Sequence, residues 1–111
     1  MSRGALRTVV ALLVVAAPAL ADDRGRALYV TRCSPCHGAD GRGDGPGAGA
    51  IEPKPRNFRD PEFWRTRTPA QIRETVLKGK PGTLMSPFEG ALSDDEIDAV
   101  LKHLETFRPA S

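Results

Sequence analysis

The feature that most constrains this chain is the segment Cys33-Ser34-Pro35-Cys36-His37, which contains both of its cysteines. On a helical turn, residues three apart in sequence project from one side, so both thiols can reach two edges of one planar ligand. The imidazole of His37 follows directly and can be aimed at a metal in that ligand. The pattern Cys-x-x-Cys-His is typical of covalent haem attachment. We therefore expect one haem c, held by Cys33 and Cys36 and ligated by His37.

Three other interpretations of this segment are less favoured. A redox-active dithiol has the same spacing, but it belongs to βαβ surroundings, and no alternating strand pattern is present. A zinc site needs about four nitrogen or sulfur ligands. After residue 21, the only cysteines and histidines are the three in this segment and His103. A structural disulfide would close a very small loop with almost no entropic benefit.

Residues 1–21 are predicted to be a cleaved signal peptide. Arg3 and Arg7 precede an uncharged, largely apolar run over residues 8–21, which ends in Ala19-Leu20-Ala21. This arrangement is the one that a signal peptidase cleaves. As a helix the run would cover about 21 Å, short of the roughly 30 Å hydrocarbon layer, so a retained anchor is less favoured. Residues 22–111 would form the mature domain, located in a bacterial periplasm and without a membrane span.

The composition indicates one small domain whose side chains alone are too few to fill its core. Without Arg3 and Arg7, the 16 basic residues become 14 and equal the 14 acidic ones. The main argument for a nucleic-acid partner is thereby removed. The chain has one Trp, one Tyr and four Phe against 11 Gly and 10 Pro. Because this makes a thin core, something other than side chains is expected to fill it.

The first part of the mature chain predicts a helix followed by a loop. The aspartates at 22 and 23 can cap a helix that ends near residue 33. Gly25 lies four residues before Tyr29 on the same face, where the missing side chain lets another helix approach closely. Between residues 38 and 49 every second or third residue is glycine. This stretch is expected to be a loop within the domain.

Three further helices are predicted. Asp60-Pro61 combines a capping residue with a proline in the first turn and opens a short helix. Residues 68–71 form a capping box that opens the next helix, which Gly79 closes. Residues 93–96 form a second capping box before an amphipathic helix that ends near Phe107. Residues 80–92 cannot be regular, so the fold class is all-α with about four helices and two long loops.

With these elements the chain resembles a class I cytochrome c, the small monohaem kind of bacterial periplasms. The resemblance implies N- and C-terminal helices packed together around one covalently bound haem. It runs from residue 25 to about residue 107, nearly the whole mature chain. Besides the haem motif it rests on Gly25-x-x-Leu28-Tyr29, His37-Gly38-Ala39-Asp40-Gly41, Gly43-Asp44-Gly45-Pro46, Gly82-x-x-Met85 and Ser86-Pro87-Phe88 before Leu92-Ser93.

The second axial ligand of the iron is predicted to be Met85, opposite His37. Met85 lies in a loop rich in Pro and Gly, where the family has its methionine ligand, and its thioether is the soft donor left once both cysteines are used. Its alternative role is to fill a gap beneath the loop. His103 lies at the boundary of an apolar helix face, where the family often has an aromatic residue, so helix packing is favoured over ligation. The family commonly has proline directly after the methionine, whereas Ser86 intervenes here, which makes the backbone of Met85 less fixed.

The groups that support the haem are also candidates. A haem-binding histidine is normally oriented by a hydrogen bond from its other ring nitrogen. The family uses a proline carbonyl for this bond, which points to Pro46 first and Pro53 second. Trp64, Arg56 and Asn57 are candidates to reach haem propionates, with core packing or solvated surface as the alternative.

Two protein ligands on the iron leave no open coordination site, which disfavours substrate binding and metal-assisted hydrolysis. We expect a monomeric periplasmic electron carrier, not an enzyme, that exchanges one electron with redox partner proteins. The nearest alternative is the electron-accepting subunit of a periplasmic oxidoreductase complex. A pentacoordinate haem peroxidase or gas-binding protein is a more distant one. Residues 54–80 hold eight basic residues against three acids. This polarity can orient an acidic partner or be ordinary solvated surface.

Overall fold

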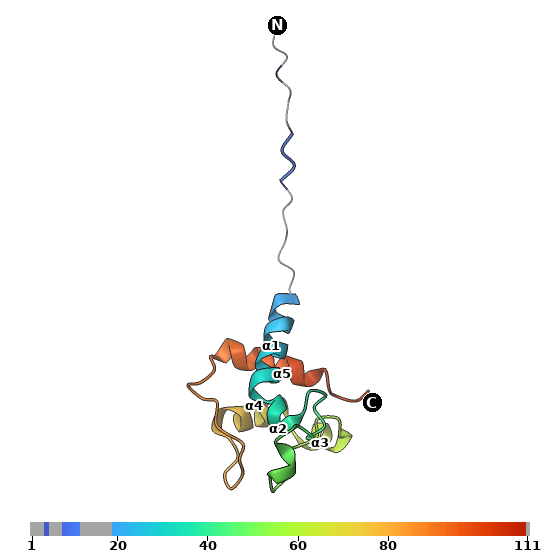
Figure 1. Ribbon diagram of the computed structural model, residues 1–111, viewed down its shortest axis with the longest axis vertical. Helices are drawn as coiled ribbons and strands as arrows, with labels where there is room; N and C mark the ends of the chain where they lie inside the picture. Colours follow the sequence, from blue (N-terminus) through green and yellow to red (C-terminus); the bar gives the residue numbers. More distant parts are fainter. Residues whose placement is uncertain (1–3, 5–7, 12–18, 111) are drawn as a thin grey trace.

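The computed structural model of the protein describes residue 4, residues 8–11 and residues 19–110 (Figure 1). Within these residues the secondary structure is helical, apart from an isolated bridge between Glu89 and Leu92. The all-α fold class is therefore confirmed. Most of the predicted signal peptide lies outside the described residues, so its cleavage stays a prediction. The helices are α1 (Ala19–Arg32), α2 (Ser34–His37), η1 (Ala48–Ala50, a 3-10 helix), α3 (Pro61–Thr66), α4 (Pro69–Lys78) and α5 (Asp94–Glu105).

One predicted helix start is wrong, and one predicted helix end differs by two residues. Helix α1 begins at Ala19 and not at the aspartates 22 and 23. The reason is local propensity, because alanine and leucine are among the strongest helix formers and extend the helix upstream of the aspartates. Helix α5 ends at Glu105, two residues before the predicted end near Phe107. There the Phe107 N–H donates to the Leu104 carbonyl at 3.0 Å, a bond of the tighter 3-10 type.

The predicted caps of the later helices are confirmed. The Asp60 carboxylate accepts the Glu62 N–H at 3.0 Å and so caps α3. Thr68 and Gln71 exchange the two hydrogen bonds of a capping box at the start of α4. Ser93 and Glu96 do the same for α5. Short-range hydrogen bonds thus fix where α3, α4 and α5 begin.

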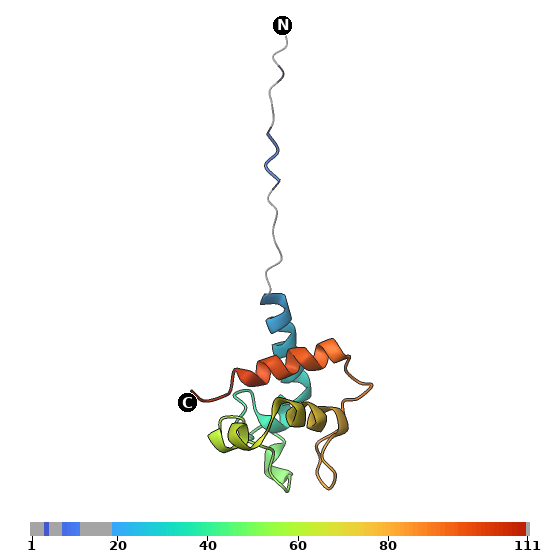
Figure 2. The same ribbon diagram turned by 180° about the vertical axis from the view of Figure 1, so that it is seen from behind.

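Helices α1 and α5 cross in close contact, as the two views show (Figures 1 and 2). Gly25 lies at the crossing, where an added Cβ atom would overlap the Ala99 backbone. One turn further on, the fully buried Tyr29 contacts the ring of His103 at 5.0 Å and that of Phe107 at 5.2 Å between centroids. The predicted packing of the N- and C-terminal helices is confirmed.

The apolar core is small and divided into two clusters, both of which contact Cys33. One cluster lies around Tyr29 and the other around Ile97, the residues that are completely buried. The core therefore reaches the haem motif from both sides. The first cluster consists of Tyr29, Phe58, Phe63, Ile72, Leu104 and Phe107, and the second of Val76, Leu92, Ile97 and Val100.

The helix crossing predicts that Gly25→Ala destabilises the domain. The new methyl group would lie against the Ala99 carbonyl, and overpacking of this kind costs about 1–3 kcal/mol. Gly49→Ala is the matched control, because an added Cβ atom there meets nothing within 4 Å. Thermal and denaturant unfolding of the two purified variants gives the comparison. Equal loss of stability in both would contradict the close crossing.

Candidate functional site

A cavity of about 550 Å³ opens beside α2 and α4, and it is lined by all four predicted cofactor-binding residues. They are Cys33, Cys36, His37 and Met85, and Met85 comes from the loop between α4 and α5. The volume lies within the range of about 300–1,000 Å³ that is usual for small-molecule and cofactor sites. The fold thus brings together residues that lie up to 52 positions apart.

The two cysteines stand on one helical turn and are free thiols. The His37 N–H donates to the Cys33 carbonyl at 2.9 Å, which closes the turn. Burial, together with the neighbouring Cys36, raises the pKa of the Cys33 thiol to about 11. A redox-active dithiol needs a thiolate with a lowered pKa. The environment of Cys33 therefore argues against the dithiol interpretation, and no disulfide joins the two residues.

His37 is held in place by a backbone carbonyl and an aromatic ring. Its Nδ1 lies 3.1 Å from the Arg56 carbonyl, and its ring stacks on Phe58 with 4.5 Å between centroids. Because a carbonyl only accepts, the ring proton belongs on Nδ1, and Nε2 keeps its lone pair for a metal. Burial lowers the pKa of His37, although the bond to Arg56 opposes this shift. The arrangement matches the supported histidine ligands of metal sites.

The orienting carbonyl is that of Arg56, so the sequence-based choice between Pro46 and Pro53 is corrected. The segment just before Pro46 instead bonds to the backbone of α2, where the Gly45 N–H donates to the Cys36 carbonyl at 3.0 Å. The segment around Arg56 instead passes the ring of His37. Pro53 lines the cavity but provides no hydrogen bond to this ring.

The backbone at Met85 is fixed by hydrogen bonds, in contrast to the expectation from Ser86. The Met85 N–H donates to the Thr83 hydroxyl at 3.1 Å, and that hydroxyl donates to the Lys80 carbonyl at 2.7 Å. The Lys80 N–H in turn donates to the Met85 carbonyl at 3.3 Å. Gly79 adopts a φ of +70° and packs tightly against that same carbonyl. The sequence analysis did not single out Thr83, although hydroxyl residues that bond nearby backbone are a recognised signal in turns.

His103 is confirmed as a helix-packing residue. It does not line the cavity, and its ring contacts those of Tyr29 and Phe107 at 5.0 and 5.1 Å between centroids. Burial and the nearby charge of Arg26 lower the pKa of His103. His103 therefore lies outside the set of residues that would hold a haem in this cavity.

Of the three residues expected near propionates, only Arg56 lines the cavity. The Trp64 indole N–H instead donates to the Phe58 carbonyl at 2.7 Å, within the fold. The Asn57 side chain accepts the Arg59 backbone N–H at 2.8 Å. The expectation is therefore corrected for Trp64 and Asn57, whose polar groups are used to shape the loop before α3.

The cavity lining is apolar and basic. It includes five cationic side chains and no Asp or Glu, and the cations come from separate segments: Arg32, Lys54, Arg56, Arg67 and Lys80. Two thiols, an imidazole, a thioether and several cations are the groups that a porphyrin with vinyl edges, a central iron and two propionates requires. Within the described residues, no group of three or more His, Cys, Asp or Glu side chains is arranged to hold a metal ion. The thiols, the imidazole, the thioether and the cations of the cavity lining fit a haem.

A helical fold around such a cavity, with Cys-x-x-Cys-His on its wall, is that of a c-type cytochrome. The family model described as cytochrome c oxidase, cbb3-type, subunit III, matches residues 20–104. The chain therefore belongs to this family and is an electron-transfer protein that carries haem c. Within residues 4, 8–11 and 19–110, no helix has the length and apolar character needed to cross a membrane.

Similar proteins include one curated relative and two solved structures. The chain is 40% identical over 80 residues to dihydro-heme d1 dehydrogenase of Pseudomonas aeruginosa. The matched region covers 72% of this chain but only 14% of the relative. It is also similar to a chain of the Kuenenia stuttgartiensis reducing HAO-like protein complex Kustc0457/Kustc0458, with 30% sequence identity and a TM-score of 0.66. The matched region covers 78% of this chain and 42% of that one. The c-type cytochrome KustC0563 gives the same identity and TM-score, covering 77% of this chain and 98% of its own.

Proposed function

We propose that residues 22–111 form a periplasmic cytochrome c that carries single electrons between redox proteins, after export and removal of residues 1–21. The observation that carries this proposal is the convergence of Cys33, Cys36, His37 and Met85 on one cavity. The bound haem supplies reversible exchange of one electron between ferric and ferrous iron. In this proposal the thiols of Cys33 and Cys36 would hold the haem covalently, and His37 and Met85 would ligate its iron.

The remaining residues of the site control the environment of the iron. Apolar side chains such as Phe58 and Val100 line the cavity and exclude water from it. The Arg56 carbonyl orients His37 and makes it a better donor. A thioether from Met85 raises the reduction potential relative to a second histidine. Because His37 and Met85 would both ligate the iron, no open coordination site would remain for a substrate, and the chain itself would act as a carrier.

Replacing both cysteines tests covalent attachment. In a host that matures cytochromes, the exported protein is expected to be red, with the mass of a polypeptide that begins at Asp22 plus one haem. Cys33→Ala combined with Cys36→Ala should give the polypeptide mass alone. Ser34→Ala, on the same turn, is the control and should keep the haem. Intact mass spectrometry measures the masses of the wild type, the double cysteine variant and Ser34→Ala. Colourless wild-type protein would contradict the proposal.

Replacing the methionine tests axial ligation. Met85→Ala should remove the far-red charge-transfer absorbance of the oxidised protein, which arises from thioether sulfur bound to iron. The reduced variant should also bind carbon monoxide rapidly, whereas the wild type should bind it slowly. His103→Gln is the control and should retain the band. Survival of the band in Met85→Ala would exclude this ligand.

Thr83 is expected to keep Met85 in place. Thr83→Val keeps the shape of the side chain but loses the hydroxyl that bonds both Met85 and Lys80, and each of these two hydrogen bonds contributes about 1 kcal/mol. The far-red band should therefore disappear at lower temperature in Thr83→Val, while Thr83→Ser restores it. Helical circular dichroism gives the global unfolding temperature for comparison. A band that is lost at the same temperature in all three proteins would refute this role.

A second candidate function is that of an electron-accepting subunit in an oxidoreductase complex. This candidate is supported by the length of two relatives. The matched region makes up only 14% of the dehydrogenase and 42% of the chain from the HAO-like complex. Gel filtration of the native protein under mild conditions distinguishes the two candidates. Elution with a larger polypeptide in fixed stoichiometry would favour the subunit.

A further inference from the structure

One short segment, residues 56–58, makes both of the contacts that hold the ring of His37. The Arg56 carbonyl lies 3.1 Å from Nδ1, and the Phe58 ring stacks on the imidazole with 4.5 Å between centroids and 20° between the planes. The first contact fixes one atom at the edge of the ring, and the second fixes the plane of the ring. The position of this segment therefore determines how the imidazole is turned.

Phe58 is in turn held from two directions. Its backbone N–H donates to the Gly41 carbonyl at 2.7 Å, and its own carbonyl accepts the Trp64 indole N–H, also at 2.7 Å. The ring of Phe63, the residue before Trp64 in α3, packs against the Phe58 ring with 5.2 Å between centroids. The loop after the haem motif thus provides one support for Phe58, and α3 provides the other.

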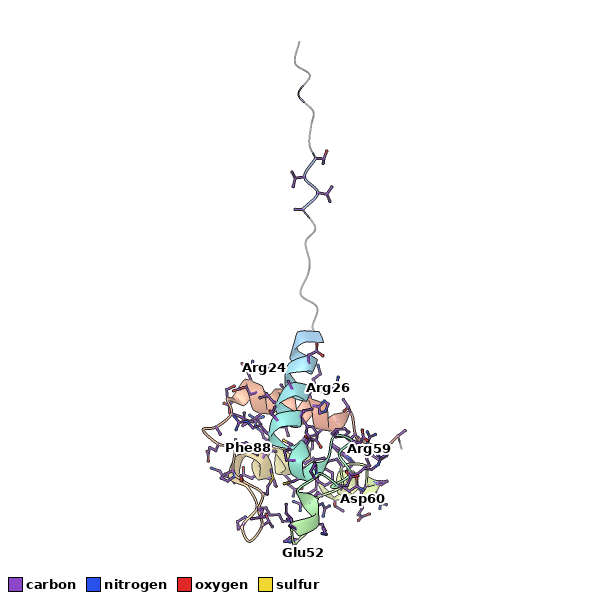
Figure 3. All side chains as sticks on the ribbon, viewed as in Figure 1. Arg24, Arg26, Glu52, Arg59, Asp60 and Phe88 are labelled. Carbon is purple, nitrogen blue, oxygen red and sulfur yellow. The ribbon has the colours of Figure 1, made fainter. Side chains whose placement is uncertain are left out.

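Trp64 belongs to α3 and does not line the cavity, so it can influence the site only through the residues that it holds. A buried indole N–H usually finds some acceptor, so a hydrogen bond by itself assigns no role. What matters here is the acceptor, because the Phe58 ring stacks on the proposed ligand. Figure 3 shows that Arg59 and Asp60, which lead into α3, lie on the opposite flank of the domain from Phe88 in the loop between α4 and α5. Trp64 therefore acts on the histidine side of the site.

We propose that Trp64 is a positioning residue for the histidine ligand: its indole N–H fixes Phe58, whose ring sets the orientation of His37 towards the Arg56 carbonyl. A histidine supported in this way is a better donor to a metal, and hydrogen bonds around an axial ligand are among the factors that set a reduction potential. Loss of the indole N–H should therefore make His37 a weaker donor, which favours ferrous iron and raises the potential. This inference deepens the proposed function and rests on it.

Trp64→Phe keeps an aromatic ring in α3 and removes the donor. In the reduced holoprotein, NMR measures how fast the Nδ1 proton of His37 exchanges with solvent deuterium. The backbone amide of Val100, which is buried in α5, reports global unfolding in the same sample. We expect Trp64→Phe to accelerate exchange at His37 about fivefold more than at Val100. Equal acceleration at both sites, or none at His37, would show a merely structural role and overturn the proposal.

The reduction potential gives a second measurement, with Arg108→Gln as the matched control. Trp64→Phe should shift the equilibrium between ferric and ferrous iron about threefold towards ferrous, as voltammetry measures it. Arg108 stands over the same indole ring, 5.5 Å from its centroid, without taking part in the bond to Phe58. At a salt concentration that screens surface charge, Arg108→Gln should keep the wild-type potential and the wild-type exchange at His37. A shift as large as that of Trp64→Phe would point to packing of the indole ring, against the proposal.

Phe58→Leu tests whether Trp64 acts through the ring of Phe58. Leucine keeps the backbone carbonyl that accepts the indole N–H but removes the ring that stacks on His37. Because residues in one chain of contacts are not additive, Trp64→Phe should change the exchange at His37 less in Phe58→Leu than in the wild type. Additive effects would overturn this route.

The wild type separates failure of this inference from failure of the proposed function. A wild-type holoprotein in which the ring of His37 gives no NMR signals shifted by a bound haem would overturn both. Shifted signals that are the same in the wild type and in Trp64→Phe, with the same exchange of the Nδ1 proton, would overturn this inference alone.

Discussion

The structure depends on filling one apolar space. Six buried core residues, Phe58, Phe63, Ile72, Val76, Val100 and Leu104, also line the cavity of about 550 Å³. If this volume were enclosed and left unfilled, a cost of about 24 cal/mol per Å³ would amount to about 13 kcal/mol. That value is as large as the whole stability of a typical domain, about 5–15 kcal/mol. The haem is therefore part of the hydrophobic core as well as the carrier of the electron.

Features that depend on neighbouring residues could be predicted from the sequence. The capping boxes at Thr68 and Ser93 need partners three residues away, and both form as expected. The close approach at Gly25 was also predictable, because a missing side chain is visible in the sequence. The start of α1 was not, because a nearby cap competes with the helix propensity of Ala19 and Leu20.

Features that depend on the path of a loop could not be predicted. The four proposed donors, which line one cavity, were predicted from residue type, but the carbonyl that orients His37 belongs to Arg56, 19 residues further on. That partner depends on how the glycine-rich segment folds back on α2, where Gly45 comes so close to the Ser34 carbonyl that no side chain would fit. Likewise, the basic lining is assembled from separate segments, so no local pattern reveals it.

One loop carries both the proposed methionine ligand and the most exposed apolar side chain of the cavity lining. Met85 is half-buried in the lining, whereas its neighbour Leu84 is 70% exposed. The backbone therefore passes from solvent to the cavity within one peptide bond, next to the proposed ligand. The hydrogen bonds between Thr83, Lys80 and Met85 stiffen this segment, so contact with a redox partner need not displace the thioether. A stiff turn in this place lets the protein expose its redox centre to a partner while the coordination of the iron stays constant.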